Sequence, residues 1–311
     1  MRYPISTSIH LFFSPDSTAL NAQIARHIDA GFRYLDFNFL DWAAIPDAPL
    51  FADDDTFRRW MDSAGETAAR GGARFNQAHA PCPVLNLKND LAAYEAACVR
   101  AFDGCRILGV PWMVFHYVGY PENFGTSDKW ALNLAIFRRM LAHAHRTGVG
   151  IAIENLFTGG LVRGTACKPV DYAIALADEL NDPLVGICCD TGHCHIAKYN
   201  RTAPTDSLNP ADAIRKIGPR LKALHVHDNN TSDDEHIPPF YGTIDWPDVM
   251  RALAEIQYAH SFTFESHNAT RRLPDALRDE AARLLHRSVA DRFGTSVRLK
   301  IPAEFIERKS M

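Results

Sequence analysis

Six residues that can ligate a metal ion or carry a proton recur along the chain at nearly constant intervals. They are His79, His116, Glu154, Asp190, His225 and Glu265. The intervals between neighbours are 37, 38, 36, 35 and 40 residues, and each residue ends a short apolar run such as IAIE or FTFE. Imidazole and carboxylate groups together suit Zn²⁺, Mn²⁺ or Co²⁺, whereas all-oxygen sites favour Mg²⁺ or Ca²⁺. The pattern therefore predicts a divalent-metal site whose carboxylates could also act as acid and base.

Polar residues that follow these runs add further candidates. The segment DTGH brings His193 back toward the strand end, HVH adds His227, and TSDDEH adds Asp234 and His236. Two histidines spaced i, i+2 share a strand face but need not both bind metal, since one can contact the substrate or support a ligand. Taken alone, each of these residues is as readily explained as a solvated polar residue at a strand end or, for a histidine, as part of the core. Crowded carboxylates at one edge repel one another unless a cation lies among them, and the full set therefore favours a metal site.

An interval of this size accommodates one strand, one helix and two loops. Apolar runs at 3–9 and 33–39 bring the number of expected strands to eight. Segments with helical periodicity separate the runs. The expected helices are Thr18–Ala30, Thr56–Arg70, Asp90–Leu108, Ser127–Thr147, Pro169–Leu180, Pro210–Ile217, Trp246–Ile256 and Pro274–Phe293.

Eight strand–helix units without a compositional break predict an α/β fold, a single (β/α)8 TIM barrel over residues 1–293. A doubly wound sheet is the competing fold, but its ligands gather at a switch point served by two or three strands. Six functional strand ends suit a barrel mouth better. Residues 294–311 lie beyond the repeated unit and form a C-terminal extension.

Strand alternation gives a finer expectation for the barrel interior. Ala152 and Glu154 are two residues apart and would both point inward. Cys188 and Cys189 are adjacent and would point to opposite faces, so we interpret them as small core residues rather than as metal ligands.

Charge and composition narrow the class of protein. The 33 basic and 37 acidic residues give a net charge of −4, which argues against binding nucleic acid through phosphate contacts. Seven cysteines without a CxxC pair favour reduced thiols. The N-terminus lacks a signal-peptide pattern, and no run of 18 apolar residues occurs. We expect a cytoplasmic enzyme with no membrane partner; the sequence is compatible with a homo-oligomer but does not define one.

Several motifs together resemble those of the xylose isomerase-like TIM-barrel superfamily. They are HAP at 79–81, EN at 154–155, DTGH at 190–193, HVHDN at 225–229, D-x-H at 234–236 and G-x-I-D-W at 242–246, with His116 and Glu265. The resemblance covers roughly residues 3–293. This superfamily includes metal-dependent sugar isomerases and epimerases as well as endonuclease IV-type apurinic endonucleases. DTGH combined with HxHDN is more specific for the superfamily than for either reaction.

Similarity to the epimerases implies one divalent ion, Zn, Mn, Co or Mg, held by Glu154, Asp190, His225 and Glu265. The ion would bind a ketose carbonyl and the adjacent hydroxyl and acidify the C–H between them, giving a metal-stabilised enediolate. Glu154 and Glu265 would remove and return the proton as base and acid. The residues that would line the pocket or bind additional metal are His79, His116, His193, His227, Asp234 and His236.

Similarity to the endonucleases implies up to three zinc ions instead. The ligand positions that this pattern matches are His79, His116, Glu154, Asp190, His193, His225, Asp234, His236 and Glu265. The loop DWAAIPDAPLFADDD argues against a DNA substrate, because it carries five aspartates and no basic residue. Phe240 and Tyr241 stand where both groups usually carry glycine, and Thr231 lies where some ketose epimerases carry arginine.

The sequence therefore predicts a metal-dependent isomerase or epimerase acting on a small sugar, a keto-polyol or a sugar phosphate. A trinuclear-zinc phosphodiesterase acting on abasic DNA is the alternative. A metal-binding barrel without catalysis is a third class, and the presence of Glu154 and Glu265 argues against it. His79 and His116 are the undecided pair, since the two enzymatic readings differ in whether these residues touch metal or sugar.

Overall fold

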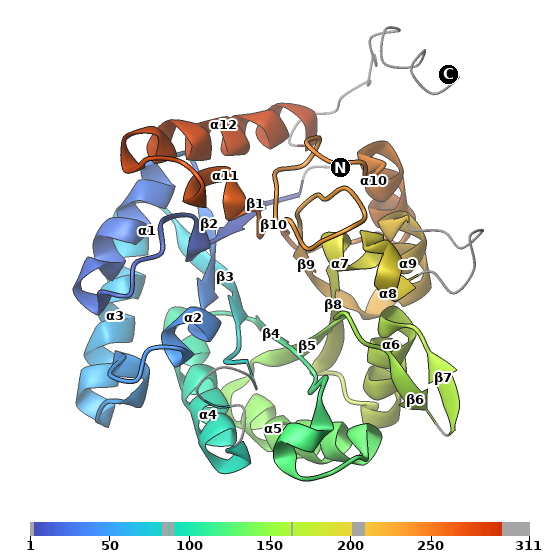
Figure 1. Cartoon of the computed structure of the whole chain (residues 1–311). Helices are drawn as coiled ribbons and strands as arrows, with labels where there is room; N and C mark the ends of the chain where they lie inside the picture. Colours follow the sequence, from blue (N-terminus) through green and yellow to red (C-terminus); the bar gives the residue numbers. More distant parts are fainter. Residues whose placement is uncertain (1–2, 83–86, 88–89, 163, 201–208, 294–311) are drawn as a thin grey trace, which may run out of the picture.

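Eight parallel strands curl into a barrel with helices around its outside (Figure 1). The computed structural model describes residues 3–82, 87, 90–162, 164–200 and 209–293. The strands are β1 Ile5–Ser8, β2 Tyr34–Asn38, β3 Arg74–His79, β4 Trp112–Phe115, β5 Gly150–Glu154, β8 Val185–Asp190, β9 Leu221–His225 and β10 Phe262–Phe264. Sheet order runs from β10 through β1, β2, β3, β4, β5 and β8 to β9. The predicted (β/α)8 barrel is confirmed.

The ring is completed between β9 and β10. Val226 pairs in parallel with Phe264, and the Val226 N–H donates to the Thr263 carbonyl oxygen at 2.8 Å. The Glu265 N–H in turn donates to the Val226 oxygen at 3.1 Å. These bonds join the edge strands, so the strand ends form one closed rim.

All eight expected helices are present among the described residues. They are α1 Leu20–Asp29, α3 Asp54–Arg70, α4 Leu91–Leu108, α5 Lys129–Thr147, α6 Pro169–Leu180, α9 Pro210–Ile217, α10 Trp246–Glu255 and α12 Asp275–Phe293. Aspartates fix several helix starts, because their side chains accept a hydrogen bond from a free N–H of the first turn. Asp53, Asp90 and Asp128 cap α3, α4 and α5 in this way.

The short elements at the strand ends were not predicted. They are helices α2 Phe39–Ala43, α7 Thr191–His195, α8 Ala197–Asn200 and α11 Asn268–Arg271, and the hairpin of β6 Gly160–Val162 with β7 Thr165–Cys167. Single turns of 3-10 helix cover Ile9–Phe12, Ser17–Ala19, Pro49–Phe51, Pro121–Phe124 and Gly218–Arg220. Such pieces are too short to show a hydrophobic period in sequence. The expected C-terminal extension, 294–311, lies outside the described residues.

Two layers of apolar side chains hold the barrel together. The larger one fills the space between strands and helices and includes Cys189. The smaller one lies inside the barrel and consists of Val114, Ala152, Cys188 and Ala223. Cys188 and Cys189 therefore do point to opposite faces, and burial raises the pKa of Cys188 to about 12. These small interior residues form an apolar floor beneath the polar strand ends.

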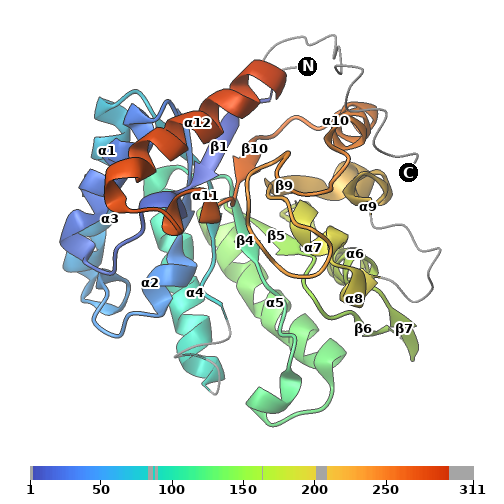
Figure 2. The same ribbon diagram turned by 45° about the horizontal axis from the view of Figure 1, so that its top comes forward.

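The loop between β9 and α10, orange in Figures 1 and 2, lies beside α7 and β10 in both views. Backbone bonds tie it to its neighbours: Ala197 N–H donates to Thr231 O at 2.8 Å, and Asn268 N–H to His236 O at 3.2 Å. This loop brings additional polar residues to the barrel mouth. Among the described residues, no helix is both long and apolar enough to cross a membrane.

Candidate metal centre at the barrel mouth

Every predicted site residue lies at the carboxyl end of a strand or in the segment that follows it. His79, Glu154, Asp190 and His225 are the last residues of β3, β5, β8 and β9. His116 and Glu265 come directly after β4 and β10, one residue later than expected. The remaining residues are His193 in α7 and His227, Asp234 and His236 in the loop after β9. The structure thus brings the whole predicted set to one edge of the barrel.

The first group gathers around the buried carboxylate of Glu154. Its Oε2 lies 3.5 Å from His79 Nε2, 3.3 Å from His116 Nε2 and 3.2 Å from His225 Nδ1. The His79 and His116 Nε2 atoms are 3.2 Å apart, and Glu265 Oε2 is 3.4 Å from His225 Nδ1. The four strands β3, β4, β5 and β9 therefore direct their end residues at one small volume, and Glu265 approaches it from β10.

The geometry of this group fits a divalent ion. Two ligand atoms bound tetrahedrally to one zinc ion at about 2.1 Å are about 3.4 Å apart. The separations around Glu154 Oε2 match that value, whereas they are long for hydrogen bonds. Glu154 Oε2 and both ring nitrogens of His225 are buried yet have no hydrogen-bond partner among the described residues. Buried polar atoms seldom remain unsatisfied, so these atoms point to a missing ligand.

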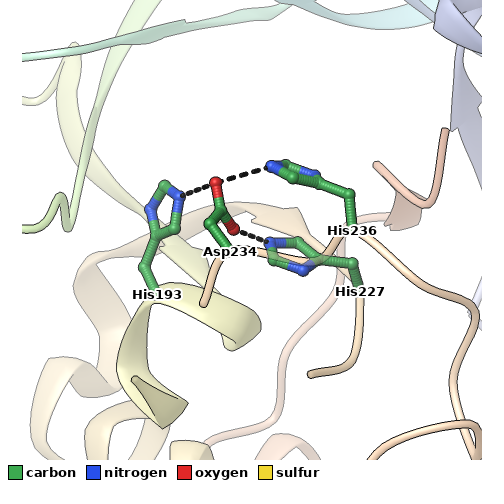
Figure 3. A group of neighbouring side chains, drawn as sticks. All are labelled: His193, His227, Asp234 and His236. Atoms are coloured by element: carbon green, nitrogen blue, oxygen red, sulfur yellow. Dashed lines mark hydrogen bonds and ion pairs between the residues drawn. The ribbon is translucent and has the colours of Figure 1, made fainter. Parts of the chain in front are cut away.

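A second group surrounds Asp234 (Figure 3). Asp234 Oδ2 lies 2.9 Å from His236 Nε2 and 3.7 Å from His193 Nε2, while its Oδ1 lies 3.6 Å from His227 Nε2. One ligand atom from each of these residues lies within 4.8 Å of every other. This group also has the residue types and spacing of a metal site.

Asp190 connects the two groups. His227 Nε2 is 3.0 Å from Asp190 Oδ1, which also accepts the His193 backbone N–H at 2.7 Å and so caps α7. Asp190, Glu154 and His193 also have ligand atoms within 4.8 Å of one another. Of the four metal ligands implied by the epimerases, Glu154, His225 and Glu265 thus meet directly. Asp190 lies beside them with its carboxylate also turned toward His227.

The motif DTGH lies where α7 and the loop after β9 approach each other closely. A Cβ on Gly192 would lie 1.9 Å from Cε1 of the His227 ring, so only glycine fits between α7 and the loop after β9. The Asn155 side chain pairs with the backbone of Asp190, accepting its N–H at 2.8 Å and donating to its oxygen at 3.1 Å. The motif thus locks the end of β8 against the end of β5.

Backbone carbonyl groups orient three of the histidines. A carbonyl oxygen can only accept, so the Nδ1–H groups of His79, His193 and His236 donate to Ala80, Asn155 and Glu265 at 2.8, 2.9 and 2.8 Å respectively. Nε2 of His79 therefore faces Glu154, and Nε2 of His193 and of His236 faces Asp234. Metal-ligating histidines are often held by a backbone bond in the same way. His225 is reversed, because its Nδ1 faces Glu154.

The loop that carries Asp234 and His236 is held by Asp228, which is fully buried. Its carboxylate accepts the backbone N–H groups of Phe240 at 3.0 Å and Ile244 at 3.2 Å, and the Trp246 indole N–H at 2.8 Å. Phe240 has a φ of 76°, a conformation that glycine adopts more readily. The hydrogen bond to Asp228 stabilises this strained residue at a position where the resemblance to the superfamily implied glycine.

Histidine contacts keep the buried carboxylates ionised. Burial alone would raise the pKa of Glu154, but His225 and His116 outweigh this effect and hold it well below its ordinary value. The pKa of Asp234 is likewise lowered, against the effect of burial, by hydrogen bonds with neighbouring histidines. Burial would lower the pKa of His236, but Asp234 raises it to about 9. Both carboxylates are therefore available as ligands or bases at neutral pH.

Sequence reasoning missed several residues that touch the site. Asp36 on β2 is buried, and its Oδ2 lies 3.6 Å from His225 Nε2. Cys82 Sγ lies 3.3 Å from His116 Nδ1, and His267 stacks on His236 with ring centroids 4.2 Å apart. The alternation in YLDFN on β2 would have placed Asp36 inside the barrel. No comparable pattern marks Cys82.

The profile of the family described as Xylose isomerase-like TIM barrel matches residues 24–287, and the chain belongs to this family. An uncharacterized protein of Sinorhizobium fredii is 28% identical over 163 residues, which are 51% of this chain and 48% of that protein. D-psicose 3-epimerase of Ruminiclostridium cellulolyticum is 26% identical over 242 residues, 74% of each chain. A probable endonuclease 4 of Mycoplasma capricolum is 24% identical, covering 58% of this chain and 64% of that protein.

The alignments span about half of the Sinorhizobium relative and about a third of another relative, the D-psicose 3-epimerase of Enterocloster bolteae. Solved structures share the fold over nearly the whole chain. D-allulose 3-epimerase from Methylomonas sp. superposes with a TM-score of 0.66 at 17% identity, covering 93% of this chain and 98% of that one. The IOLI protein with a bound zinc atom has the same TM-score at 15% identity, covering 96% and 100%.

Proposed function

We propose that the protein is a divalent-metal-dependent sugar isomerase or epimerase. The observation that carries the proposal is the convergence of two carboxylates, Glu154 and Glu265, on His225 Nδ1 at 3.2 and 3.4 Å. An epimerisation next to a carbonyl needs one group to remove a proton and another to return it. Relatives named as D-psicose 3-epimerases, from two organisms, support the assignment of this chemistry.

The residues that would hold the ion are Glu154, Asp190, His225 and Glu265. The unsatisfied buried atoms of Glu154 and His225, and the mixed nitrogen and oxygen donors of the four residues, suit Zn²⁺, Mn²⁺ or Co²⁺. When bound, such an ion supplies a Lewis acid that lowers the pKa of a C–H adjacent to a ketose carbonyl.

The chain's own residues carry the proton transfers. Glu154 is ionised because neighbouring histidines lower its pKa, and it can therefore accept a proton from substrate carbon. Glu265 comes directly after β10 and would return a proton to the opposite face of the sugar. His193 and His236 present Nε2 to the centre and can hold sugar hydroxyl groups.

The proposal is tested by incubating the metal-loaded protein with ketopentoses and ketohexoses in D₂O and detecting deuterium on carbon by NMR. Wild-type protein is expected to incorporate deuterium into at least one ketose. Glu265→Gln should lose formation of the epimer by at least 100-fold, because the amide fills the same space but cannot transfer the proton. Glu235→Gln is the matched control, since Glu235 bonds Asn230 within the nearby loop. Epimer formation retained in Glu265→Gln would remove Glu265 from the acid–base role.

A phosphodiesterase acting on abasic DNA is the second candidate. It is favoured by the ligand-like spacing of both His79–His116–Glu154 and the group around Asp234, since together they offer places for more than one ion. The aspartate-rich segment between β2 and α3 argues against it, because DNA phosphates need basic residues. Near three zinc ions per chain with cleavage of an abasic duplex would favour the nuclease. Near one ion per chain without cleavage would favour the sugar enzyme.

A further inference from the structure

An apolar cavity of about 250 Å³ lies beside the candidate metal centre. It is formed by the segments that follow β4 and β5, and its walls include Tyr117, Val118, Leu156 and Phe157, with the half-exposed Tyr120 also in its lining. Neither the metal site nor the proton transfers described above use these residues.

Two residues that line the cavity also contact residues of the candidate metal centre. His116 lines it and also places Nε2 3.3 Å from Glu154 Oε2. Phe157 lines it and packs on His193, with ring centroids 4.4 Å apart. A molecule whose polar part lies on the carboxylates and histidines would therefore reach the cavity with any group attached to it.

The residues that line the cavity favour an uncharged group on a bound molecule. Among the described residues that line the cavity, none is Asp, Glu, Lys or Arg. The Tyr117 hydroxyl already donates to the Thr158 carbonyl oxygen at 2.7 Å, and the nearby Lys129 ammonium donates to Thr158 and Gly159. A phosphate here would lose its hydration without a charged partner. Aromatic and branched aliphatic walls instead suit an alkyl chain or an aryl ring.

We propose that this cavity is a substrate subsite and that the natural substrate is a sugar carrying an uncharged apolar substituent, such as an alkyl or aryl group, rather than a sugar phosphate. The inference rests on the proposed function and specifies its substrate class. The size is adequate, since an engineered cavity of about 150 Å³ binds benzene. A phenyl ring or a six-carbon chain fits this volume together with its link to the sugar.

The first experiment measures the cavity itself with 1-butanol, 1-pentanol and 1-hexanol, by titration followed with NMR. Each added methylene buried in an apolar site should strengthen binding about fourfold. The second experiment uses the deuterium-exchange assay to compare kcat/KM for a ketose that exchanges with kcat/KM for its hexyl ethers, each of which carries one hexyl group on a different hydroxyl oxygen. For one of these ethers, kcat/KM should exceed that of the parent ketose by at least tenfold.

Tyr120→Asp places a charge at an exposed wall residue and should lower the hexyl-to-parent ratio of kcat/KM about tenfold. Leu284→Asp, at an equally exposed apolar residue on α12, is the matched control and should keep the ratio. A ratio near one for every isomer, or equal losses in both variants, would overturn the subsite while leaving the proposed function intact. Absence of exchange with every ketose would overturn the proposed function, and with it the substrate assignment, even if hexanol binds.

Discussion

Replacing Asp228 by alanine should both destabilise the fold and release the loop that carries Asp234 and His236. The Asp228 carboxylate is fully buried and accepts hydrogen bonds from Ile244 N at 3.2 Å and Trp246 Nε1 at 2.8 Å. Both donors belong to buried residues, so the Asp228→Ala variant removes these two hydrogen bonds where little water can replace them. Each unsatisfied buried donor costs about 1–3 kcal/mol, giving a loss of about 4 kcal/mol in the free energy of unfolding.

The loss is measured by urea unfolding of the metal-free protein at pH 7. Asp228→Asn keeps one acceptor oxygen and should lose about half as much, so it remains informative if the alanine variant does not fold. Asp245→Ala is the matched control. Asp245 caps α10 by accepting Asp248 N–H, and loss of a cap costs about 1 kcal/mol.

Ketose binding to the metal-loaded protein provides the functional measurement for the same variants. Asp228→Asn should weaken this binding by more than tenfold, because Phe240 and Ile244 no longer hold the loop of Asp234 and His236 as firmly. Asp245→Ala should leave ketose binding unchanged. If Asp228→Ala costs no more stability than Asp245→Ala, the account of Asp228 as the anchor of this loop is wrong.

Three further outcomes follow from buried contacts. Gly192→Ala should lower the free energy of unfolding by about 1–3 kcal/mol, since its Cβ would overlap the His227 ring; a change below about 0.5 kcal/mol in urea unfolding would contradict this. Burial lowers the pKa of His27 from an ordinary 6.5 to about 4, so the unfolded chain binds a proton at this residue more readily than the folded protein does. The free energy of unfolding should therefore fall by about 3 kcal/mol as the pH drops from above 6.5 toward 4. His27→Gln should remove that portion of the pH dependence, and unchanged curves for the two proteins would refute it. Burial would lower the pKa of His225, but Cys188 and the carboxylates of Glu265 and Glu154 raise it well above its ordinary value. Zinc binding near pH 7 should therefore release protons and tighten as pH rises, which calorimetry in buffers of different ionisation enthalpy will detect; a proton release of zero would oppose this.

The barrel could be predicted because its signal is spread over the whole chain. Each apolar run recurs after a helix-sized interval, and parallel strands bring their carboxyl ends to one edge whatever the loops do. The convergence of Glu154, His225 and Glu265 follows from that geometry alone. The ends of two strands were harder to predict, because β4 and β10 end one residue before His116 and Glu265.

The contacts that support the site could not be read from the sequence in the same way. In the sequence, Asp228 stands out only as part of the motif HVHDN. Its role as an anchor is not visible there, because its hydrogen bonds reach residues up to Trp246 through a loop whose path is not periodic. The contact of Asp36 with His225 joins β2 to β9 across the barrel interior, so it depends on closure of the ring. The short helix α7 begins where Asp190 caps it, and no hydrophobic period marks it in the sequence.

Reconstitution of the metal-stripped protein tests the central claim most directly. The measurement is the rate of deuterium incorporation into ketose carbon as Zn²⁺, Mn²⁺ or Co²⁺ is added in increasing equivalents. We predict no exchange without added ion and a rate that saturates near one equivalent per chain. Exchange that persists after chelation, or none with any ion and any ketose, would contradict metal-dependent proton transfer at this barrel mouth.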